Sequence, residues 1–190
     1  MGSAKALLDW KGTPAVAHLV AILRAGVDGG PVVVVGAPGQ ALPALDDALL
    51  TEDGVASEGP LRGLEAGLIA LEGLADVAFV SGVDTPLLEP AFVRSVLAAL
   101  REGDDAVVPV IGGREQPLLA AYRVSLGPRI AEVLAAGVRS MGELGRHCSA
   151  RALGEDDLLA DPLLAAADPT LRSARNANSP TEWANLLAEA

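Results

Sequence analysis

The stretch Pro31-Val32-Val33-Val34-Val35-Gly36 indicates the fold class of this chain. Its four consecutive valines do not alternate with polar residues, which is typical of a parallel strand buried on both faces. A helix is predicted just before it, because apolar residues recur at helical spacing from Val16 to Leu23 and Gly26 stops the run. Thr13 and Pro14 are the expected N-cap and first-turn pair of this helix. We therefore expect helices packed on a buried sheet.

The same alternation of helix and strand continues to the end of the chain. Further helices are predicted over residues 40–50, 61–71, 90–100, 126–136 and 180–190, and strands over residues 77–80, 106–110 and 118–124. Strands separated by helices imply right-handed crossovers, so we expect a three-layer, Rossmann-like α/β fold with a mostly parallel central sheet flanked by helices. Residues 154–169 predict a solvated pair of amphipathic helices. The whole chain, 1–190, is expected to form one domain, with 154–190 as its helical C-terminal part.

Composition excludes several classes of function. The chain has 190 residues, of which 51% are hydrophobic but only 3% aromatic, and its net charge is −11. An acidic chain poor in aromatic residues suits neither phosphate neutralisation nor base stacking, so no nucleic-acid partner is expected. The uncharged residues between Lys11 and Arg24 are too few to cross a bilayer, and Gly and Pro break the longer apolar run after Gly29, so no membrane partner is expected either.

The single cysteine, Cys148, rules out an internal disulfide and a multi-thiolate metal site. The N-terminus shows no basic segment followed by an apolar signal core. Both observations favour a cytoplasmic protein. His147 stands beside Cys148, but adjacent side chains usually diverge, so a partly buried thiol is favoured over a nucleophilic pair.

Asp84 is the first residue that points to chemistry. It follows the strand predicted over 77–80, in the sequence Ser81-Gly82-Val83-Asp84-Thr85-Pro86. Ligands of open parallel sheets bind at the carboxyl ends of the strands, where Asp84 is expected to lie. A carboxylate there suits Mg²⁺, which is usually held by one or two protein carboxylates together with substrate phosphates. The structural alternative is that Asp84 only opens a turn before Pro86.

Three other segments are weaker candidates when each is taken alone. Asp53 follows a short strand expected over 49–51, yet acidic turn residues are common. Gly59-Pro60-Leu61-Arg62-Gly63-Leu64 places a glycine before a helix that Pro60 opens, and the free amides of that helix start suit an anion or a nucleobase edge. Lys5 follows Gly2 and is one of two lysines in the chain, so it is a candidate for binding a polyphosphate.

The order of these pieces along nearly the whole chain resembles the molybdenum cofactor guanylyltransferase family, among nucleotidyltransferases of glycosyltransferase-A-like fold. The motifs that carry the resemblance are Gly2 to Leu8, Gly12-Thr13-Pro14, the valine strand, Gly59 to Leu64, Asp84 to Leu87, Gln116 to Tyr122 and Asn176-Ala177-Asn178-Ser179-Pro180.

The resemblance implies a role for each matching residue. Lys5 and Asp84 would be catalytic, with Lys5 on the triphosphate and Asp84 on Mg²⁺ and the nucleotide. The remaining nucleotide-binding residues would be Asp53, Gly59, Pro60, Leu61 and Gly63. The acceptor, a molybdopterin-type compound, would be bound by Arg114, Gln116, Pro117, Asn176 and Asn178. The implied reaction is attack of the acceptor phosphate on the α-phosphorus of GTP, with release of pyrophosphate.

The sequence departs from the family pattern at three places. Gln116 stands where the family often has histidine, and Gly36 stands where it can have an asparagine near the base. The chain opens at Met1-Gly2, in the middle of the family's glycine-rich signature, so the first strand and the phosphate-binding turn are expected to be missing. We interpret Met1 as an internal methionine or a cut site.

Two alternatives to the guanylyltransferase remain open. One is a related enzyme that uses CTP or another NTP with a different phosphorylated acceptor. The other is a catalytically silent relative that binds a cofactor or partner. The resemblance also implies a monomer or weak homo-oligomer, in transient contact with proteins that mature molybdoenzymes.

Overall fold

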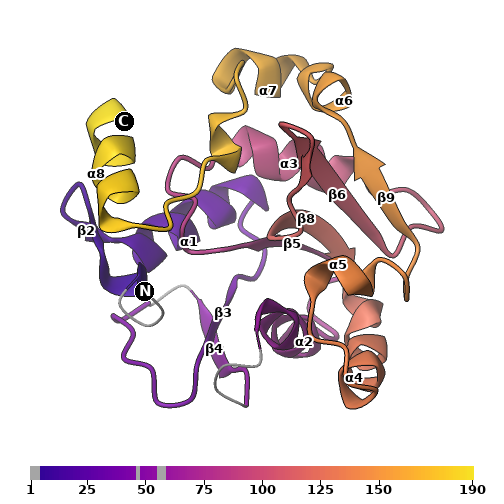
Figure 1. Cartoon of the computed structure of the whole chain (residues 1–190). Coiled ribbons are helices and arrows are strands. Elements are labelled where there is room, and N and C mark those ends of the chain that lie inside the picture. Colours follow the sequence, from indigo (N-terminus) through magenta and orange to yellow (C-terminus); the bar gives the residue numbers. More distant parts are fainter. Residues whose placement is uncertain (1–4, 46–47, 55–58) are drawn as a thin grey trace.

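The computed structural model describes residues 5–45, 48–54 and 59–190 (Figure 1). Residues 1–4, which hold the Met1-Gly2 part of the expected nucleotide signature, lie outside the described residues. The largest sheet contains β5 (Val77–Ser81), β8 (Leu119–Arg123) and β6 (Ala106–Ile111) in that order, and β6 also pairs with β7 (Arg114–Glu115) and β9 (Ala150–Leu153).

The α/β class is confirmed, but the sheet is mixed rather than mostly parallel. β8 runs antiparallel to both β5 and β6, whereas β9 runs parallel to β6. The reason lies in the connection between β6 and β8. Only residues 112–118 join them, and β7 occupies part of this segment. A parallel pair needs a crossover of a dozen or more residues, so this short link returns the chain antiparallel.

Strands β3 (Val33–Gly36) and β4 (Leu49–Glu52) form a separate parallel pair, with Val33 opposite Leu49. The valine strand and the short strand expected near 49–51 are therefore confirmed. The helix predicted over 40–50 is wrong: the described residues from 37 to 45 form no helix, and the chain is already extended at Leu49. Pro43 lies inside the expected helix and removes a backbone donor there, and residues 46–47 lie outside the described part.

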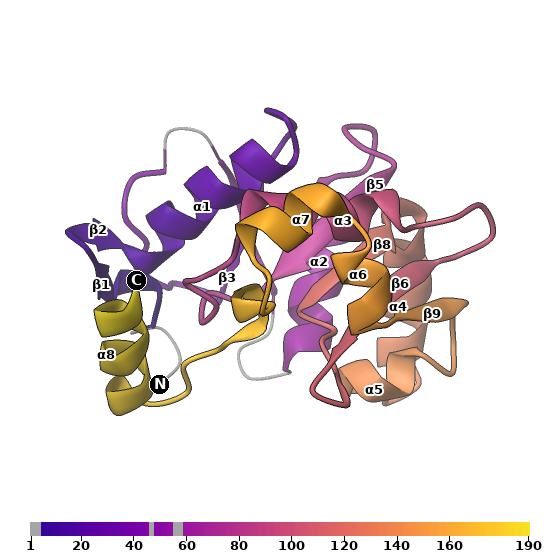
Figure 2. The same cartoon turned by 90° about the horizontal axis from the view of Figure 1, so that it is seen from above.

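Helices cover both faces of the strands in three layers (Figure 2). One face carries α1 (Ala15–Gly26), α3 (Pro90–Ala98), α6 (Glu155–Leu159) and α7 (Pro162–Ala167), and the other carries α2 (Pro60–Ala70), α4 (Gly127–Ala135) and α5 (Met141–Leu144). The expected helices before the valine strand and over 61–71, 90–100 and 126–136 are confirmed. Residues 154–169 do form a helix pair, α6 and α7, though Leu158 and Leu164 are buried.

β8 shows how the two faces are separated. Leu119 and Ala121 belong to the core that includes α1 and α3, whereas Ala120 and Tyr122 belong to the core that includes α2 and α4. All four are buried. Successive side chains of a strand point to opposite faces, so an uninterrupted apolar strand serves both cores.

The two ends of the described chain lie side by side. β1 (Asp9–Trp10) and β2 (Thr13–Pro14) form a small hairpin, and the final helix α8 (Pro180–Glu189), which confirms the prediction for 180–190, packs on it (Figures 1 and 2). The rings of Trp10 and Trp183 meet edge to face with centroids 5.3 Å apart. The prediction that Thr13 is the N-cap of the helix before the valine strand is wrong: α1 begins at Ala15, so Pro14 takes the N-cap position.

Three short 3₁₀ helices complete the description: η1 (Lys5–Leu7), η2 (Val124–Leu126) and η3 (Arg172–Ala174). None of the helices in the described part of the chain has the length and apolar character needed to cross a membrane.

Candidate active site

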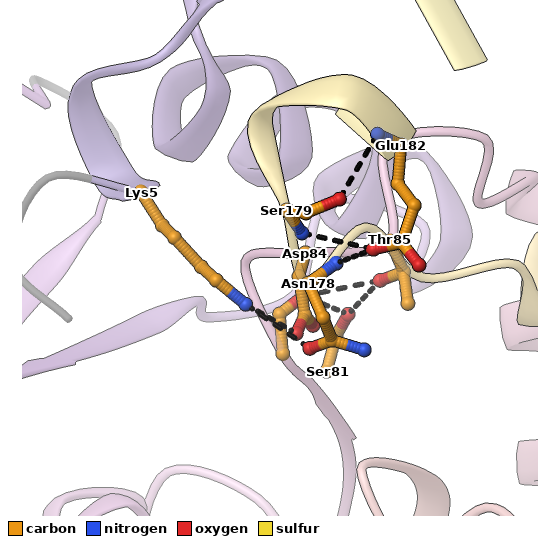
Figure 3. Close-up of polar contacts among 8 residues, drawn as sticks. Lys5, Ser81, Asp84, Thr85, Asn178, Ser179 and Glu182 are labelled. Atoms are coloured by element: carbon orange, nitrogen blue, oxygen red, sulfur yellow. Dashed lines mark hydrogen bonds and ion pairs between the residues drawn. The ribbon is translucent and has the colours of Figure 1, made fainter. Parts of the chain in front are cut away.

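Lys5 and Asp84 meet at the carboxyl end of β5, as the sequence led us to expect. The Nζ atom of Lys5 lies 3.1 Å from Oδ2 of Asp84 and 3.3 Å from Oδ1 of Asn178 (Figure 3). The side chains are 17% and 24% exposed for Lys5 and Asp84, so the pair is shielded yet open to a ligand. Three residues from distant parts of the chain thus form one polar cluster.

The turn that carries Asp84 is fixed by hydroxyl groups. The hydroxyl of Thr85 is buried and donates to the carbonyl oxygen of Gly82 at 3.1 Å, and the hydroxyl of Ser81 donates to the same oxygen at 3.0 Å. A Cβ atom on Gly82 would lie 2.6 Å from Oδ1 of Asp84. Only glycine at position 82 therefore allows this carboxylate oxygen to pack so closely against the turn.

The start of α8 holds Asn178 in place through a capping box. The carboxylate of Glu182 accepts from the backbone amides of Asn178 at 2.7 Å and Ser179 at 2.8 Å, while the hydroxyl of Ser179 accepts from the amide of Glu182 at 3.2 Å (Figure 3). The amide of Ala177 donates to the carbonyl oxygen of Asp84 at 2.9 Å. These bonds attach the C-terminal helix directly to the Asp84 turn.

The capping box also favours the charged form of the Glu182 carboxylate. The amide of Asn178 first, and then Ser179, lower the pKa of Glu182 below its ordinary value of 4.5, because they donate to the charged carboxylate. Sequence reasoning missed Glu182, although Ser179 followed three residues later by Glu182 is a readable capping-box signature.

A second, polar pocket of about 520 Å³ lies next to this cluster. Three of the five expected acceptor residues line it, namely Arg114, Gln116 and Asn176. Glu182 lines it as well, so the capping box is shared between the pocket and the Lys5–Asp84 cluster. The other two expected residues lie elsewhere: Asn178 contacts Lys5, and Pro117 does not line the pocket but accepts a hydrogen bond from the hydroxyl of Tyr122 at 2.9 Å. The sequence did not point to Arg175 or Asn185, which line the pocket too.

The other expected nucleotide-binding residues come from the strand pair and α2. Pro60 and Gly63 border an apolar cavity together with Ser81 and Gly82, close to the Asp84 turn. Leu61, by contrast, is fully buried in the core. Gly59, with φ of +85°, precedes α2, and no side chain among the described residues caps that helix start. Its first amides are therefore available to an anion, as the sequence predicts.

Asp53 follows β4 and presents a buried carboxylate oxygen, Oδ1, that has no hydrogen-bond partner among the described residues. A buried acceptor without a partner is costly, so it is a natural place for a ligand donor. No described contact joins Asp53 to Lys5 or Asp84.

Cys148 is a half-buried thiol that donates to the carbonyl oxygen of Leu144 at 3.3 Å. Burial raises the pKa of its thiol, with the nearby Asp105 carboxylate adding to the effect. The expected partial burial of the Cys148 thiol is confirmed. No group of three or more His, Cys, Asp or Glu side chains that would hold a metal occurs in the described ranges.

The fold has clear relatives among solved structures. A chain from Archaeoglobus fulgidus, described as "Molybdopterin-guanine dinucleotide biosynthesis protein A", superposes with a TM-score of 0.72 at 20% identity, covering 97% of this chain and 89% of that one. The "2-C-methyl-D-erythritol 4-phosphate cytidylyltransferase" of Thermus thermophilus gives a TM-score of 0.66 at 20% identity, covering 100% and 96%. The fold is therefore that of a nucleotidyltransferase.

Sequence similarity narrows this class to a family. Residues 1–151 match the MobA-like NTP transferase domain, so the chain belongs to that family and is a nucleotidyltransferase. A "Probable molybdenum cofactor guanylyltransferase" from Bacillus cytotoxicus is 27% identical over 158 residues, or 82% of this chain and 78% of the relative. A Mycobacterium avium protein of the same name is 37% identical over 128 residues, or 67% and 64%. The resemblance seen in the sequence is thus confirmed.

Proposed function

We propose that this nucleotidyltransferase transfers GMP from GTP to the phosphate of molybdopterin, with Mg²⁺ held at Asp84. The observation that carries the proposal is the juxtaposition of the Lys5–Asp84 cluster with the polar pocket around Arg114 and Asn176. The Lys5–Asp84 cluster suits a metal-bound triphosphate, and the polar pocket suits a phosphorylated polar acceptor. The guanylyltransferase name of the curated relatives supports this choice of substrates.

The residues around Asp84 fit a hard divalent cation. Its carboxylate is partly exposed, and the lack of a side chain on Gly82 lets Oδ1 pack closely against the turn. Mg²⁺ is usually held by only one or two protein carboxylates, so the nucleotide phosphates and water would supply its remaining ligands. When bound, the ion would neutralise charge on the phosphate oxygens. A fold relative from Mycobacterium tuberculosis was solved as a manganese complex, which supports a divalent cation here.

The protein's own task in this reaction is to position two anionic substrates and stabilise charge. An oxygen of the acceptor phosphate attacks the α-phosphorus of GTP, the bond from that phosphorus to the bridging oxygen breaks, and pyrophosphate leaves with the electron pair. Lys5 would donate a hydrogen bond to the triphosphate. The triphosphate would then compete with Asp84 for the ammonium group of Lys5. Such transfers are driven mainly by positioning and electrostatics, so no nucleophilic side chain is needed.

The acceptor would be held in the polar pocket. Arg114 provides a guanidinium group that suits the acceptor phosphate, and Gln116 and Asn176 provide amides for hydrogen bonds to a pterin ring. Asn178 would join the two halves of the site, because it contacts Lys5 and follows Asn176 by two residues. Asp53 and the start of α2 would bind the nucleotide. In this proposal the protein acts in the cytoplasm, as a monomer or weak homo-oligomer, with transient contacts to molybdoenzyme maturation proteins.

The test is a competition among the four NTPs, each at equal concentration with Mg²⁺ and molybdopterin, followed by mass spectrometry of the dinucleotide product. We expect the guanine dinucleotide to dominate. A cytosine dinucleotide would overturn the choice of GTP and favour the CTP-dependent alternative. Calorimetric binding of molybdopterin without any Mg²⁺-dependent heat from GTP, and without product, would favour the silent relative.

A further inference from the structure

The turn that carries Asp84 is held at three alternate backbone carbonyl oxygens. The oxygen of Gly82 accepts from hydroxyl groups within the turn, and that of Asp84 accepts from the amide of Ala177, shortly before α8. The oxygen of Pro86 lies 2.9 Å from Nε2 of His18, which belongs to α1. Three separate parts of the chain therefore fix this turn, and His18 is the side chain that α1 contributes.

The bond between His18 and Pro86 has a defined direction. A carbonyl oxygen only accepts hydrogen bonds, so Nε2 of His18 carries the hydrogen and donates it. Proline has no backbone N–H, so its carbonyl oxygen is the only polar group through which residue 86 can be held. The contact is partly buried, and a buried acceptor that loses its partner is costly. His18 therefore supplies a polar contact that fixes the chain two residues after Asp84.

The ring of His18 is itself held by packing. Its centroid lies 5.7 Å from that of the Trp10 ring, with the planes tilted by 33°, and Trp10 in turn meets Trp183 edge to face. Both tryptophans are buried, and the indole N–H of Trp183 donates to the carbonyl oxygen of Asp9 at 3.0 Å. A row of three rings therefore runs from α8 through the hairpin to His18, and it restricts how the imidazole can turn.

The position of Pro86 affects that of Asp84, because only Thr85 separates them. Thr85 is buried, and its hydroxyl donates to the carbonyl oxygen of Gly82 at 3.1 Å, so the turn has little freedom to absorb a shift at Pro86. A side chain that binds a cation must be held within about 0.5 Å of its working position. Release of Pro86 is therefore expected to displace the Asp84 carboxylate enough to weaken cation binding.

We propose that His18 is a positioning residue for nucleotidyl transfer: by donating to Pro86, it fixes the turn that presents Asp84 to a divalent cation. This inference rests on the proposed function, in which Asp84 holds Mg²⁺ beside the nucleotide. Among the described residues, no hydrogen bond joins the side chain of His18 to Lys5 or Asp84, so His18 acts through the backbone of the turn.

The experiment separates the hydrogen bond from the ring by two substitutions. His18→Phe keeps an aromatic ring against Trp10 and removes the donor, whereas His18→Gln gives up the ring and keeps an N–H that can reach Pro86. His147→Phe is the matched control, because His147 is the only other histidine and is exposed. For the parent chain and each variant, calorimetry measures the Kd of GTP with and without Mg²⁺, and thermal unfolding measures Tm.

We expect Mg²⁺ to tighten GTP binding by about tenfold or more in the parent chain and in His147→Phe. This gain in affinity is expected to fall about fivefold in His18→Phe and to return to within about twofold of the parent value in His18→Gln, because a small displacement of a positioned group is costly. The order of Tm is expected to be the reverse, with His18→Phe at least as stable as His18→Gln, because only Phe keeps the aromatic contact.

A gain in His18→Phe equal to that of the parent chain would overturn the inference, because the turn would then keep its position without the hydrogen bond. A gain in His18→Gln as low as in His18→Phe would overturn it too, since the donor would then have no separate effect. A parent chain without any Mg²⁺ effect on GTP binding would overturn the proposed function, and with it the inference. The parent chain thus tests the proposed function, and the variants test the role of His18.

Discussion

The central sheet and the β3–β4 pair have similar valine- and leucine-rich strands, yet they are built differently. Every residue of β8 from Leu119 to Tyr122 is buried, and the strand is paired on both edges. In the β3–β4 pair, Leu49 and Leu50 are exposed and β3 borders a cavity. The comparison shows that an apolar strand sequence is not enough to form a packed core. The strand also needs partner strands on both edges and packed side chains on both faces. The Lys5–Asp84 cluster of the candidate active site lies at the carboxyl end of β5, in the central sheet.

The largest effect is expected from a residue of α3 that is packed against the central sheet. Phe92 is fully buried and meets Phe79 edge to face. Phe92→Ala is expected to lower the free energy of unfolding by about 4 kcal/mol, because it removes apolar contacts and leaves a void. Val34→Ala on β3 is the comparison variant, and should cost only about 1 kcal/mol because its side chain already borders a cavity. Urea titration measures both; equal losses would remove the distinction between the regions.

The next effect concerns catalysis at the carboxyl end of β5, in the better-packed region. Lys5→Gln is expected to reduce turnover about 100-fold, because it removes the cationic donor beside Asp84. Lys11→Gln is the matched control, since Lys11 is the only other lysine and is exposed in the hairpin. Steady-state kinetics of the parent chain and the two variants measure this difference in turnover. Similar turnover for the two variants would show that Lys5 acts only as an N-terminal contact.

A smaller effect is expected at Gly82. Gly82→Ala places a methyl group where the carboxylate oxygen of Asp84 now lies, so the carboxylate must move. We expect turnover to fall about tenfold, as for a modest displacement of a positioned group. Gly142→Ala in α5 meets no contact closer than 3.6 Å and provides the control. An unchanged KM for GTP and unchanged turnover in Gly82→Ala would contradict the close approach.

The smallest effect concerns the pH dependence of stability. Because hydrogen bonds lower the pKa of Glu182, this carboxylate stabilises the fold above its ordinary pKa of 4.5, and that stability is lost as the pH falls through the lower, folded-state value. Glu182→Gln should therefore give a flatter dependence of Tm on pH below about 5. The exposed Glu132→Gln on α4 should keep the slope of the parent chain. Identical slopes for all three proteins would show that the capping box does not titrate in this way.

Much of this architecture could be predicted from the sequence. Strong local patterns, such as the valines of β3 and Pro60 at the start of α2, were identified correctly because they act within a few residues. The direction of β8 was not predicted correctly, because strand direction depends on the length of the connection and not on the side-chain pattern. Residues 40–45 were predicted to begin a helix because Leu and Ala favour one, but these described residues form no helix.

The candidate site was predictable where a motif fixes a turn. The structure brings Lys5 and Asp84 together. The acceptor role expected for Pro117 stays a prediction; its carbonyl oxygen accepts a hydrogen bond from the hydroxyl of Tyr122. Glu182 and Arg175 were missed because their positions depend on how α8 packs against the N-terminal hairpin. Contacts between the two ends of the chain leave no pattern within either segment.

The most direct test of the central claim is the affinity for GTP, measured by calorimetry with and without Mg²⁺, for the parent chain and for Asp84→Asn. The account predicts that Mg²⁺ tightens GTP binding at least tenfold in the parent chain and has no such effect in Asp84→Asn, while both proteins keep the same Tm without ligand. If Asp84→Asn retained the full Mg²⁺ effect, Asp84 would not hold the cation and the assignment of this edge as the nucleotide site would be contradicted.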